Sequence, residues 1–518
     1  MAFASYFAKN EIAASDLLRG LDPSALRVAL DREVVAIVFD GSAAVSHEGI
    51  AGLDLTIRIL ARLYPSLAII GSDEGQAKKL RAALARLAMQ INPAISIRQS
   101  LNAATRVLVF GRTPVDPAGK LNGSIWYVGS DNWIAKVSTT HPVRCGSTKN
   151  PFGAGVAACL GTANLFRKVF SAHLPGDRSD RDIQFSVATL GAKVGADTGP
   201  RLTARHLGPI HLVGAGAIGN GFLWAMRQAR GSGKIHVIDP DAVDATNLQR
   251  YVMTVAKDEG AQKAKLADAW LKEHAANGFR VMAHPVSWEG FLDGLADWTL
   301  PCVVSAVDSA EARITIQASL PERIFNGWTQ AGEAGVSRHH FLGRQACLAC
   351  LYIPRQQQPH RDQLVLRALK LPEDEVTLKD VRRRLQQGTP TERAFLDVIS
   401  QHSGVSVDCL LPYEGTSLEA MYTQAICSGA VLALHGADNA SRAEVPMAFQ
   451  SALAGILLAA DLVLEREPWP TVTQIDLLRP FPRDPSHNRL KQASPVCLCA
   501  DRDFQDAYRT KYPLRDTC

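Results

Sequence analysis

Three glycines follow an apolar run near the middle of the chain. The run IHLV leads into Gly214, Gly216 and Gly219, spaced as G-x-G-x-x-G. Such a turn between a strand and a helix lets the backbone approach a phosphate, and the positive end of the helix dipole favours an anion. The next apolar run ends at Asp239, about 20 residues further on, where a carboxylate can accept hydrogen bonds from ribose hydroxyls. Glycine turns without a ligand are common, but the added carboxylate favours a nucleotide site.

Four polar residues downstream indicate which nucleotide would bind. Asn247, Arg250 and Lys263 follow the carboxylate, and two cations at this spacing could neutralise the α-phosphate and pyrophosphate of a triphosphate. Asp308 ends the apolar run CVVSAVD, and a carboxylate at a strand's carboxyl end could hold Mg²⁺. Separately, each has an ordinary alternative: a turn for Asn247, surface charges for the two cations and a helix N-cap for Asp308. Together they favour ATP with Mg²⁺, and the sequence contains no GxxxxGK[ST], which excludes a P-loop protein.

Four of the ten cysteines form two close pairs. Cys347 and Cys350 make a CxxC sequence after the nucleotide region, and Cys497 and Cys499 make a CxC sequence near the end. Four thiolates could build a closed tetrahedral Zn²⁺ site that joins distant parts of the chain. A redox pair or simple buried cysteines remain the alternatives.

The elements that must position these residues alternate between strand and helix. Short β-branched runs occur at EVVAIVF, SLAII, RVLVF and SIWYV in the first 130 residues, and a second such pattern begins at Pro209. This alternation predicts an α/β fold with open, mostly parallel sheets covered by helices. Two helices rich in Ala and Gly, beginning at Pro151 and Pro446, are either ordinary buried helices or the corresponding parts of a duplicated α/β unit.

Composition narrows the class of partner. The 518 residues carry a net charge of +5 with scattered basic residues, so neither nucleic acid nor a membrane surface is expected. Charged residues early in the chain leave no apolar core for a signal peptide, and the longest apolar run near the C-terminus, 16 residues, is shorter than the roughly 20 that span a bilayer. We therefore expect a cytoplasmic protein whose cysteines serve metal or thiol chemistry.

The motifs resemble those of ThiF/MoeB-type adenylyltransferases and ubiquitin-activating enzymes. The segments VGAGAIGNG, IDPDAVDATNLQRY, GAQKAK and SAVDSAEAR follow the order of this family. The resemblance implies a set of nucleotide-binding residues, with Arg250, Lys263 and Asp308 also catalytic: Gly214, Gly216, Gly219, Asp239, Asp241, Asn247, Arg250, Lys263 and Asp308. Asp239 would contact the ribose, Asn247, Arg250 and Lys263 the phosphates, and Asp308 the Mg²⁺. Tyr251 departs from the pattern, because the family often has Gln there.

The same resemblance implies a pseudodimer of two Rossmann-like adenylation-type halves. Residues 1–200 would form an inactive half and residues 201–518 the active half. A small, partly helical insertion over 355–426 would lead into a catalytic-cysteine region over 404–444. Many family members carry a CxxC and a later cysteine pair, so the Zn²⁺ would be structural.

The implied reaction is adenylation of the C-terminal glycine of a ubiquitin-like protein by ATP and Mg²⁺. Cys427 would then form a thioester and pass the acyl group to a conjugating enzyme. We prefer Cys427 to Cys409 because small residues and a helical run follow it, whereas Asp408 beside Cys409 disfavours a thiolate. The likeness is strongest to bacterial members that accompany ubiquitin-like modification systems, some of them associated with phage defence.

Three alternatives stay open at this point. The chain could adenylate a sulfur-carrier protein or a peptide without a thioester step. It could be a nicotinamide-dependent oxidoreductase that uses the same glycine turn, or a scaffold with a vestigial nucleotide site.

Overall fold

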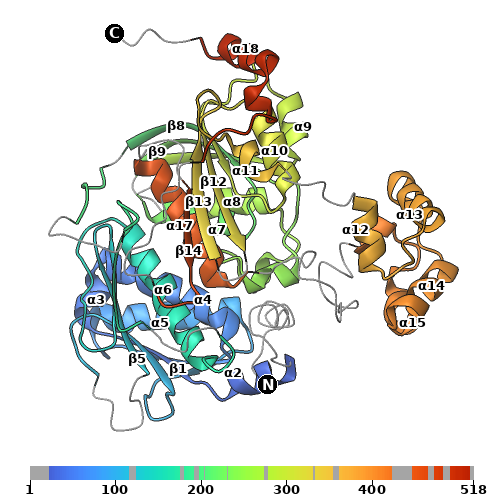
Figure 1. The fold of residues 1–518 in the computed structure, drawn as a ribbon. Helices are drawn as coiled ribbons and strands as arrows, with labels where there is room; N and C mark the ends of the chain where they lie inside the picture. The colour runs from blue at the N-terminus through green and yellow to red at the C-terminus, as the bar shows by residue number, and fades with distance from the viewer. Residues whose placement is uncertain are drawn as a thin grey trace. The chain divides into compact units, whose positions relative to one another are not determined.

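The computed structural model describes residues 23–115, 124–174, 180–191, 198–203, 205–229, 231–272, 278–330, 333–353, 361–422, 446–464, 472–481 and 491–513. Its main part contains two seven-stranded mixed sheets, one from each half of the chain, with helices packed against them (Figure 1). The predicted α/β class with two Rossmann-like halves is confirmed.

The N-terminal sheet has the strand order β3-β2-β1-β4-β5-β6-β7. Its strands are β1 (Val35–Phe39), β2 (Ser66–Ile70), β3 (Ser96–Arg98), β4 (Arg106–Phe110), β5 (Ile125–Asp131), β6 (Ile134–Ser138) and β7 (Asp182–Ser186). Its helices are α2 (Pro23–Asp31), α3 (Gly41–Val45), α4 (His47–Leu63), α5 (Gly75–Ile91) and α6 (Phe152–Val169). The strands from β3 to β5 pair in parallel, and β6 and β7 are added antiparallel. The four apolar runs noted in the sequence form β1, β2, β4 and β5.

The C-terminal sheet repeats this topology in the order β10-β9-β8-β11-β12-β13-β14. Its strands are β8 (Arg205–Val213), β9 (Gly231–Ile238), β10 (Gly278–His284), β11 (Val303–Ser305), β12 (Ile324–Gln330), β13 (Glu333–His339) and β14 (Val472–Asp476). Its helices are α7 (Ala217–Gln228), α8 (Lys263–Lys272), α9 (Trp288–Asp293), α10 (Ala310–Ala318), α11 (Leu348–Tyr352), α17 (Ala448–Leu464) and α18 (Arg502–Lys511), with short 3₁₀ turns η2 (Ala245–Gln249), η3 (Ala256–Asp258) and η6 (Leu498–Ala500). The parallel and antiparallel pairings fall at the same places as in the first sheet.

The two helices rich in small residues occupy equivalent places. Helix α6 joins β6 to β7 and α17 lies between β13 and β14, and both are almost entirely buried. Helix α17 packs against α7 and against α6 of the other half. Small residues allow this close approach: a Cβ on Gly221 of α7 would lie 2.8 Å from the Ala452 carbonyl oxygen of α17. The packing of these helices thus joins the two halves.

Residues 354–445 form a compact unit of their own. Its described elements are α12 (Arg361–Ala368), α13 (Glu375–Gln387), α14 (Arg393–Ser403), α15 (Val407–Leu410), η4 (Leu411–Tyr413) and α16 (Leu418–Met421). Leu366, Leu369, Leu396 and Ile399 belong to its apolar core. The sequence indicated a small helical insertion here, and its exact limits stay a prediction. Among the described residues, no helix combines the length and the apolar character needed to span a lipid bilayer.

Candidate functional site

The glycine turn connects β8 to α7 at the carboxyl edge of the second sheet. Gly214 has φ +93°, a left-handed conformation that favours glycine, and a Cβ there would lie 2.8 Å from the Ala306 carbonyl oxygen. Gly216 is the N-cap of α7. The Asn220 side-chain amide donates hydrogen bonds to the carbonyl oxygens of Ala215 and Gly216. At Gly219, a Cβ would lie well under 3.0 Å from the Gly214 carbonyl oxygen. The first and third glycines are therefore required by packing, while the second leaves space at the helix N-terminus.

Asp239 follows β9 and fixes the neighbouring turn. Its Oδ2 accepts a hydrogen bond from the Ala215 N–H at 2.7 Å, and its Oδ1 accepts one from the Asp241 N–H at 2.9 Å. Burial raises the pKa of Asp239 above its usual value, although Lys263 and the two backbone N–H groups oppose the shift. The predicted ribose-binding carboxylate thus lies directly beside the glycine turn.

Lys263 begins α8 and is 7% exposed. Its Nζ lies 2.8 Å from Asp241 Oδ2 and 4.0 Å from Asp239 Oδ1. Burial by itself would lower its pKa, but Tyr251, Asp239 and Asp241 outweigh burial, so the pKa is raised and the ammonium stays charged. The structure therefore brings the predicted lysine to the predicted carboxylate.

Asn247, Arg250 and Tyr251 lie in and after the 3₁₀ turn η2. Asn247 Oδ1 accepts from the Asp244 N–H in a capping box, as the turn alternative predicted. The Arg250 guanidinium carbon and Lys263 Nζ lie 5.6 and 5.5 Å from the centroid of the Tyr251 ring. A Cβ on Gly216 would be 3.4 Å from the Tyr251 hydroxyl. The ring is thus close to two cations and next to the glycine turn.

Asp308 is exposed in the loop between β11 and α10. Strand β11 is paired with β8, so this loop shares an edge with the glycine turn. Arg313, which is 4% exposed, donates to the carbonyls of Val307 and Ser309 on either side of Asp308. Arg313 also donates from Nε to Asn326 Oδ1 at 3.1 Å.

Two residues that organise this edge were not assigned by the sequence. Asn220 is fully buried, and its Oδ1 also accepts from the Met253 N–H at 3.0 Å. Its place directly after the third glycine was the signal that could have found it. Arg313 lies within the motif SAVDSAEAR, where a buried arginine fixes the loop of Asp308.

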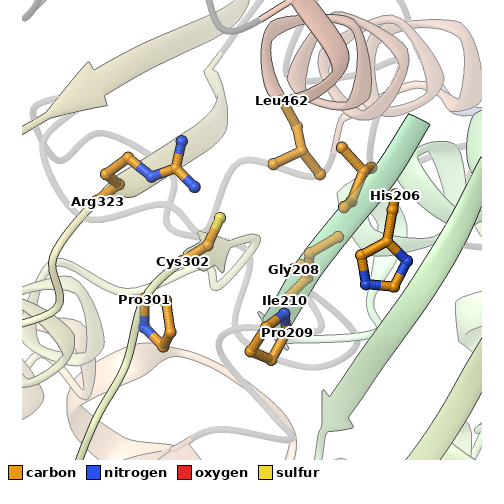
Figure 2. Close-up of a pocket in the computed structure, with 9 residues that line it drawn as sticks. His206, Gly208, Pro209, Ile210, Pro301, Cys302, Arg323 and Leu462 are labelled. Carbon is orange, nitrogen blue, oxygen red and sulfur yellow. The ribbon is translucent and has the colours of Figure 1, made fainter. Parts of the chain in front are cut away.

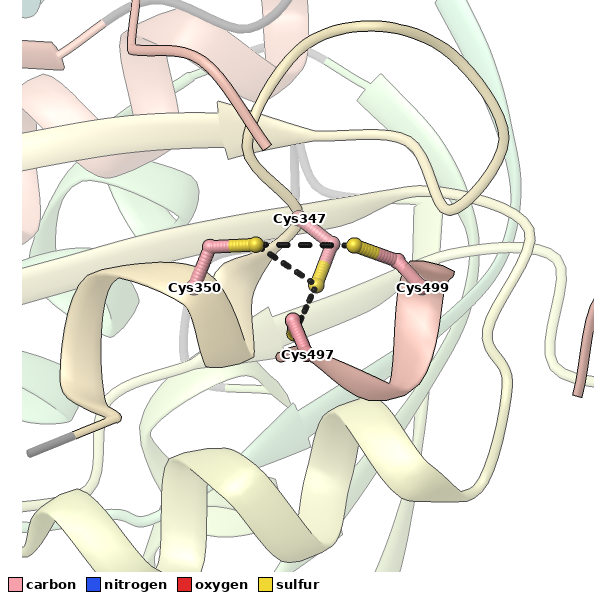
Figure 3. A group of neighbouring side chains, drawn as sticks. All are labelled: Cys347, Cys350, Cys497 and Cys499. Carbon is pink, nitrogen blue, oxygen red and sulfur yellow. Dashed lines mark hydrogen bonds between the residues drawn. The ribbon is translucent and has the colours of Figure 1, made fainter. Parts of the chain in front are cut away.

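The four paired cysteines come together (Figure 3). Their sulfur atoms all lie within 4.8 Å of one another, with Cys347–Cys497 and Cys350–Cys499 at 3.5 Å and Cys347–Cys350 at 3.8 Å. A tetrahedron with Zn–S bonds of about 2.3 Å has sulfur–sulfur edges of about 3.8 Å. Hydrogen bonds from Cys347 lower the pKa of Cys350 and of Cys497. The donor set and its spacing fit Zn²⁺.

The predicted nucleophile Cys427 lies outside the described residues. Cys409 belongs to helix α15, and its side chain is not among those described. The choice between these two cysteines therefore stays a prediction.

A cavity of about 230 Å³ lies elsewhere on the second half (Figure 2). It is lined by the start of β8, by residues that precede β11 and β12, and by one residue of α17: His206, Leu207, Gly208, Pro209, Ile210, Pro301, Cys302, Arg323 and Leu462. Because it lies at the amino ends of the parallel strands, it is at the opposite edge of the sheet from the glycine turn and does not belong to the nucleotide site.

Comparisons with known proteins match two families, one in each half of the chain. Residues 38–171 match the Prokaryotic E2 family C, and residues 201–463 match the ThiF family. The chain is 41% identical over 517 residues to the uncharacterized protein y4jF of Sinorhizobium fredii, covering 99% of this chain and 98% of that protein.

Solved structures give only a distant likeness. Crystal structures of E. coli MccB with MccA-N7isoASN and with ATP are 15% and 14% identical, each with a TM-score of 0.33 over 57% of this chain and 67% of that one. These values are too low to carry an argument. The family match over the second half, together with the ordered motifs, shows that the chain belongs to the ThiF family of adenylyltransferases.

Proposed function

We propose that this chain activates the C-terminal glycine of a ubiquitin-like protein with ATP and then carries the acyl group as a thioester. One observation carries the adenylation step: Asp239, Lys263 and the turn at Gly216 meet at the carboxyl edge of a sheet in a ThiF-family half. In open α/β sheets this edge is where ligands bind.

The residues at this edge divide into those that bind and those that compensate charge. Asp239 would accept hydrogen bonds from the ribose, and the N-terminus of α7 would receive phosphate oxygens. Lys263 and Arg250 would neutralise the phosphates, and the Asn247 amide nitrogen would donate to them. Arg250 Nη1 is buried and has no hydrogen-bond partner among the described residues, so a phosphate oxygen would satisfy it.

The chemistry is a nucleotidyl transfer. A carboxylate oxygen of the modifier's C-terminal glycine attacks the α-phosphorus of ATP, the bond to the bridging oxygen breaks, and pyrophosphate leaves. Lys263 and Arg250 stabilise the charge that develops on the phosphoryl oxygens. Mg²⁺, when bound through Asp308, would neutralise phosphate charge. Arg313 would keep Asp308 in place by holding the carbonyls on both sides of it.

In the second step, the Cys427 thiolate attacks the acyl carbon of the adenylate, AMP leaves and a thioester forms. The match to a family named for prokaryotic E2 proteins supports a modifier as the substrate. The two cysteines of residues 1–200 are poor acceptors for onward transfer. Burial, with Glu48 and Asp40 nearby, raises the pKa of Cys145 to about 12, and burial also raises the pKa of Cys159. A separate conjugating enzyme is therefore the better acceptor.

The test uses the full chain and a small protein ending in glycine from a neighbouring reading frame. We expect isotope exchange between pyrophosphate and ATP that requires this protein and is lost when its C-terminus is amidated. On non-reducing gels we expect a thiol-sensitive adduct that Cys427→Ala abolishes and Cys409→Ala keeps. Exchange with no adduct would establish adenylation without a thioester step. Absence of exchange, together with binding of a nicotinamide dinucleotide, would overturn the proposal.

A further inference from the structure

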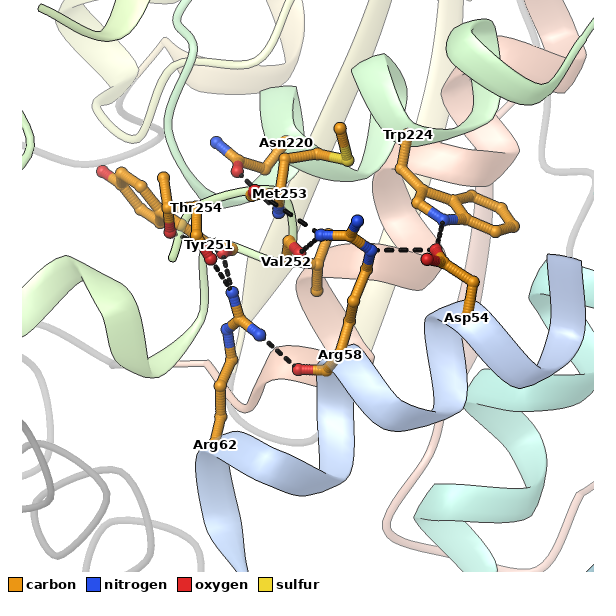
Figure 4. Close-up of polar contacts among 9 residues, drawn as sticks. All are labelled: Asp54, Arg58, Arg62, Asn220, Trp224, Tyr251, Val252, Met253 and Thr254. Carbon is orange, nitrogen blue, oxygen red and sulfur yellow. Dashed lines mark hydrogen bonds and ion pairs between the residues drawn. The ribbon is translucent and has the colours of Figure 1, made fainter. Parts of the chain in front are cut away.

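Two arginines of the N-terminal half reach into the nucleotide-binding half (Figure 4). Both lie on helix α4, one helical turn apart. Arg58 Nη1 donates to the Val252 carbonyl oxygen at 3.0 Å, and Arg62 Nη2 donates to the Tyr251 carbonyl oxygen at 2.6 Å and to that of Thr254. All these acceptors are main-chain groups of one turn, which directly follows Arg250.

Both arginines are buried, and Arg58 is held by an ion pair that also involves the second half. Arg58 and Arg62 are 6% and 2% exposed. Asp54 pairs with Arg58 Nε at 2.8 Å and accepts from Trp224 Nε1 of α7 at 2.8 Å. Burial by itself raises the pKa of Asp54, but Arg58 and the hydrogen bond from Trp224 outweigh it, so the pKa lies below its usual value. A buried guanidinium group is tolerated only when it is hydrogen-bonded. The guanidinium groups of Arg58 and Arg62 must therefore stay next to their hydrogen-bond acceptors.

The turn connects directly to the phosphate-binding loop. The Met253 N–H donates to Asn220 Oδ1, and Asn220 Nδ2 donates to the carbonyls of Ala215 and Gly216, at 2.9 Å each. A continuous chain of hydrogen bonds therefore runs from helix α4 through the turn 251–254 to the glycine turn. Because every acceptor in the turn is a carbonyl, the arginines determine where its backbone lies, and with it the positions of Arg250 and Tyr251.

We infer that Arg58 and Arg62 are positioning residues through which the N-terminal half holds the nucleotide site of the C-terminal half in shape. The expected change in KM for ATP rests on the proposed function. The expected change in the backbone of the turn does not depend on it. Docking of the first half would thus be a condition for ATP binding by the second. Neither arginine would touch the nucleotide.

The test compares Arg62→Met and Arg58→Met with Arg167→Met. Arg167 is a matched control, because it is 5% exposed and its guanidinium bonds Asn164 and Asp180 within the N-terminal half. Hydrogen–deuterium exchange of the full chain is expected to show faster uptake over 246–256 in the two α4 variants than in the control. In pyrophosphate exchange, we expect KM for ATP to rise at least tenfold with a smaller change in kcat, and Arg62→Lys to restore part of the loss.

These readouts separate the two claims. If the wild-type chain shows no pyrophosphate exchange, the proposed function fails, while deuterium uptake and binding of a fluorescent ATP analogue still test the inference. If Arg62→Met fails to fold, Arg58→Lys, which keeps the charge and loses the planar fork, is measured in its place. Uptake over 246–256 and KM for ATP that match those of Arg167→Met would overturn the inference.

Discussion

Replacing Gly219 by alanine sets two physical effects against each other. Gly219 lies in the first turn of α7, and alanine is the better helix former by roughly 1 kcal/mol. However, the added methyl would lie well under 3.0 Å from the Gly214 carbonyl oxygen, whereas ordinary contacts begin at 3.4 Å. The turn must therefore open by more than about 0.4 Å, and overpacking of this kind costs about 1–3 kcal/mol.

The clash should win, because the obstacle is backbone that cannot rotate away. The Gly214 amide is itself held by the Ile238 carbonyl, and the next amide by Asp239. We expect Gly219→Ala to lose up to about 2 kcal/mol of stability, which is the overpacking cost less the gain in helix propensity. Opening the turn also moves the amides that would receive phosphate, so affinity for ATP should fall at least tenfold.

Gly216→Ala is the matched control. A Cβ there meets nothing closer than the Tyr251 hydroxyl at 3.4 Å, and the backbone at φ −70° is open to any residue. We expect wild-type stability from this variant. Urea unfolding and titration with a fluorescent ATP analogue measure both quantities. If Gly219→Ala were as stable as the wild type and bound ATP equally well, the packing argument for the third glycine would be refuted.

The metal site, the stacked histidines and the buried lysine give three further expected outcomes. Metal analysis should find one Zn²⁺ per folded chain, and Cys350→Ser should lose it and lower the melting temperature. Burial and neighbouring imidazoles lower the pKa of His236 from 6.5 to about 4, and its Nδ1 lies 3.0 Å from His284 Nε2. Because the unfolded chain binds protons more readily in this range, stability should fall as the pH drops from 6.5 to 4, and His236→Gln should flatten that slope in unfolding experiments. Lys263→Met leaves the buried Asp239 without its cation, which should lower the free energy of unfolding by roughly 3–5 kcal/mol. This loss of stability should be smaller at pH 5 than at pH 7, because protonation of Asp239 removes its unpaired charge.

The features that the sequence could predict are those encoded locally. The runs EVVAIVF and RVLVF form β1 and β4 because β-branched residues in short apolar stretches favour buried strands. The glycine turn and Asp239 were predictable because strand, turn and next strand are adjacent in the chain. The four cysteines were predictable as a group because two close pairs of thiols are typical of a four-thiolate Zn²⁺ site.

The long-range contacts could not be predicted in the same way. Arg58 and Arg62 lie about 190 residues before the turn they hold, and nothing around them in the sequence distinguishes them from surface arginines on an amphipathic helix. Their role depends on how the two halves pack. Arg313 is an intermediate case, because its motif was noticed, but only the structure shows that it donates to the carbonyls that flank Asp308.

The two halves share one topology, yet they differ at the position where a phosphate would bind. In the first half, Asp40 follows β1, where Gly214 follows β8 in the second. Its carboxylate caps α3 by accepting from the Ala43 N–H, and it also accepts from the N–H groups of Arg112 and Thr113. Burial by itself would raise the pKa of Asp40, but a hydrogen bond from the Ser42 hydroxyl, together with those from the backbone N–H groups, outweighs burial and lowers the pKa. A carboxylate thus directly follows β1 in the first half, whereas a glycine turn follows β8 in the second. The inactivity of the first half stays a prediction, and the contact it is shown to make with the site is the pair of α4 arginines that donate to the turn beside Arg250.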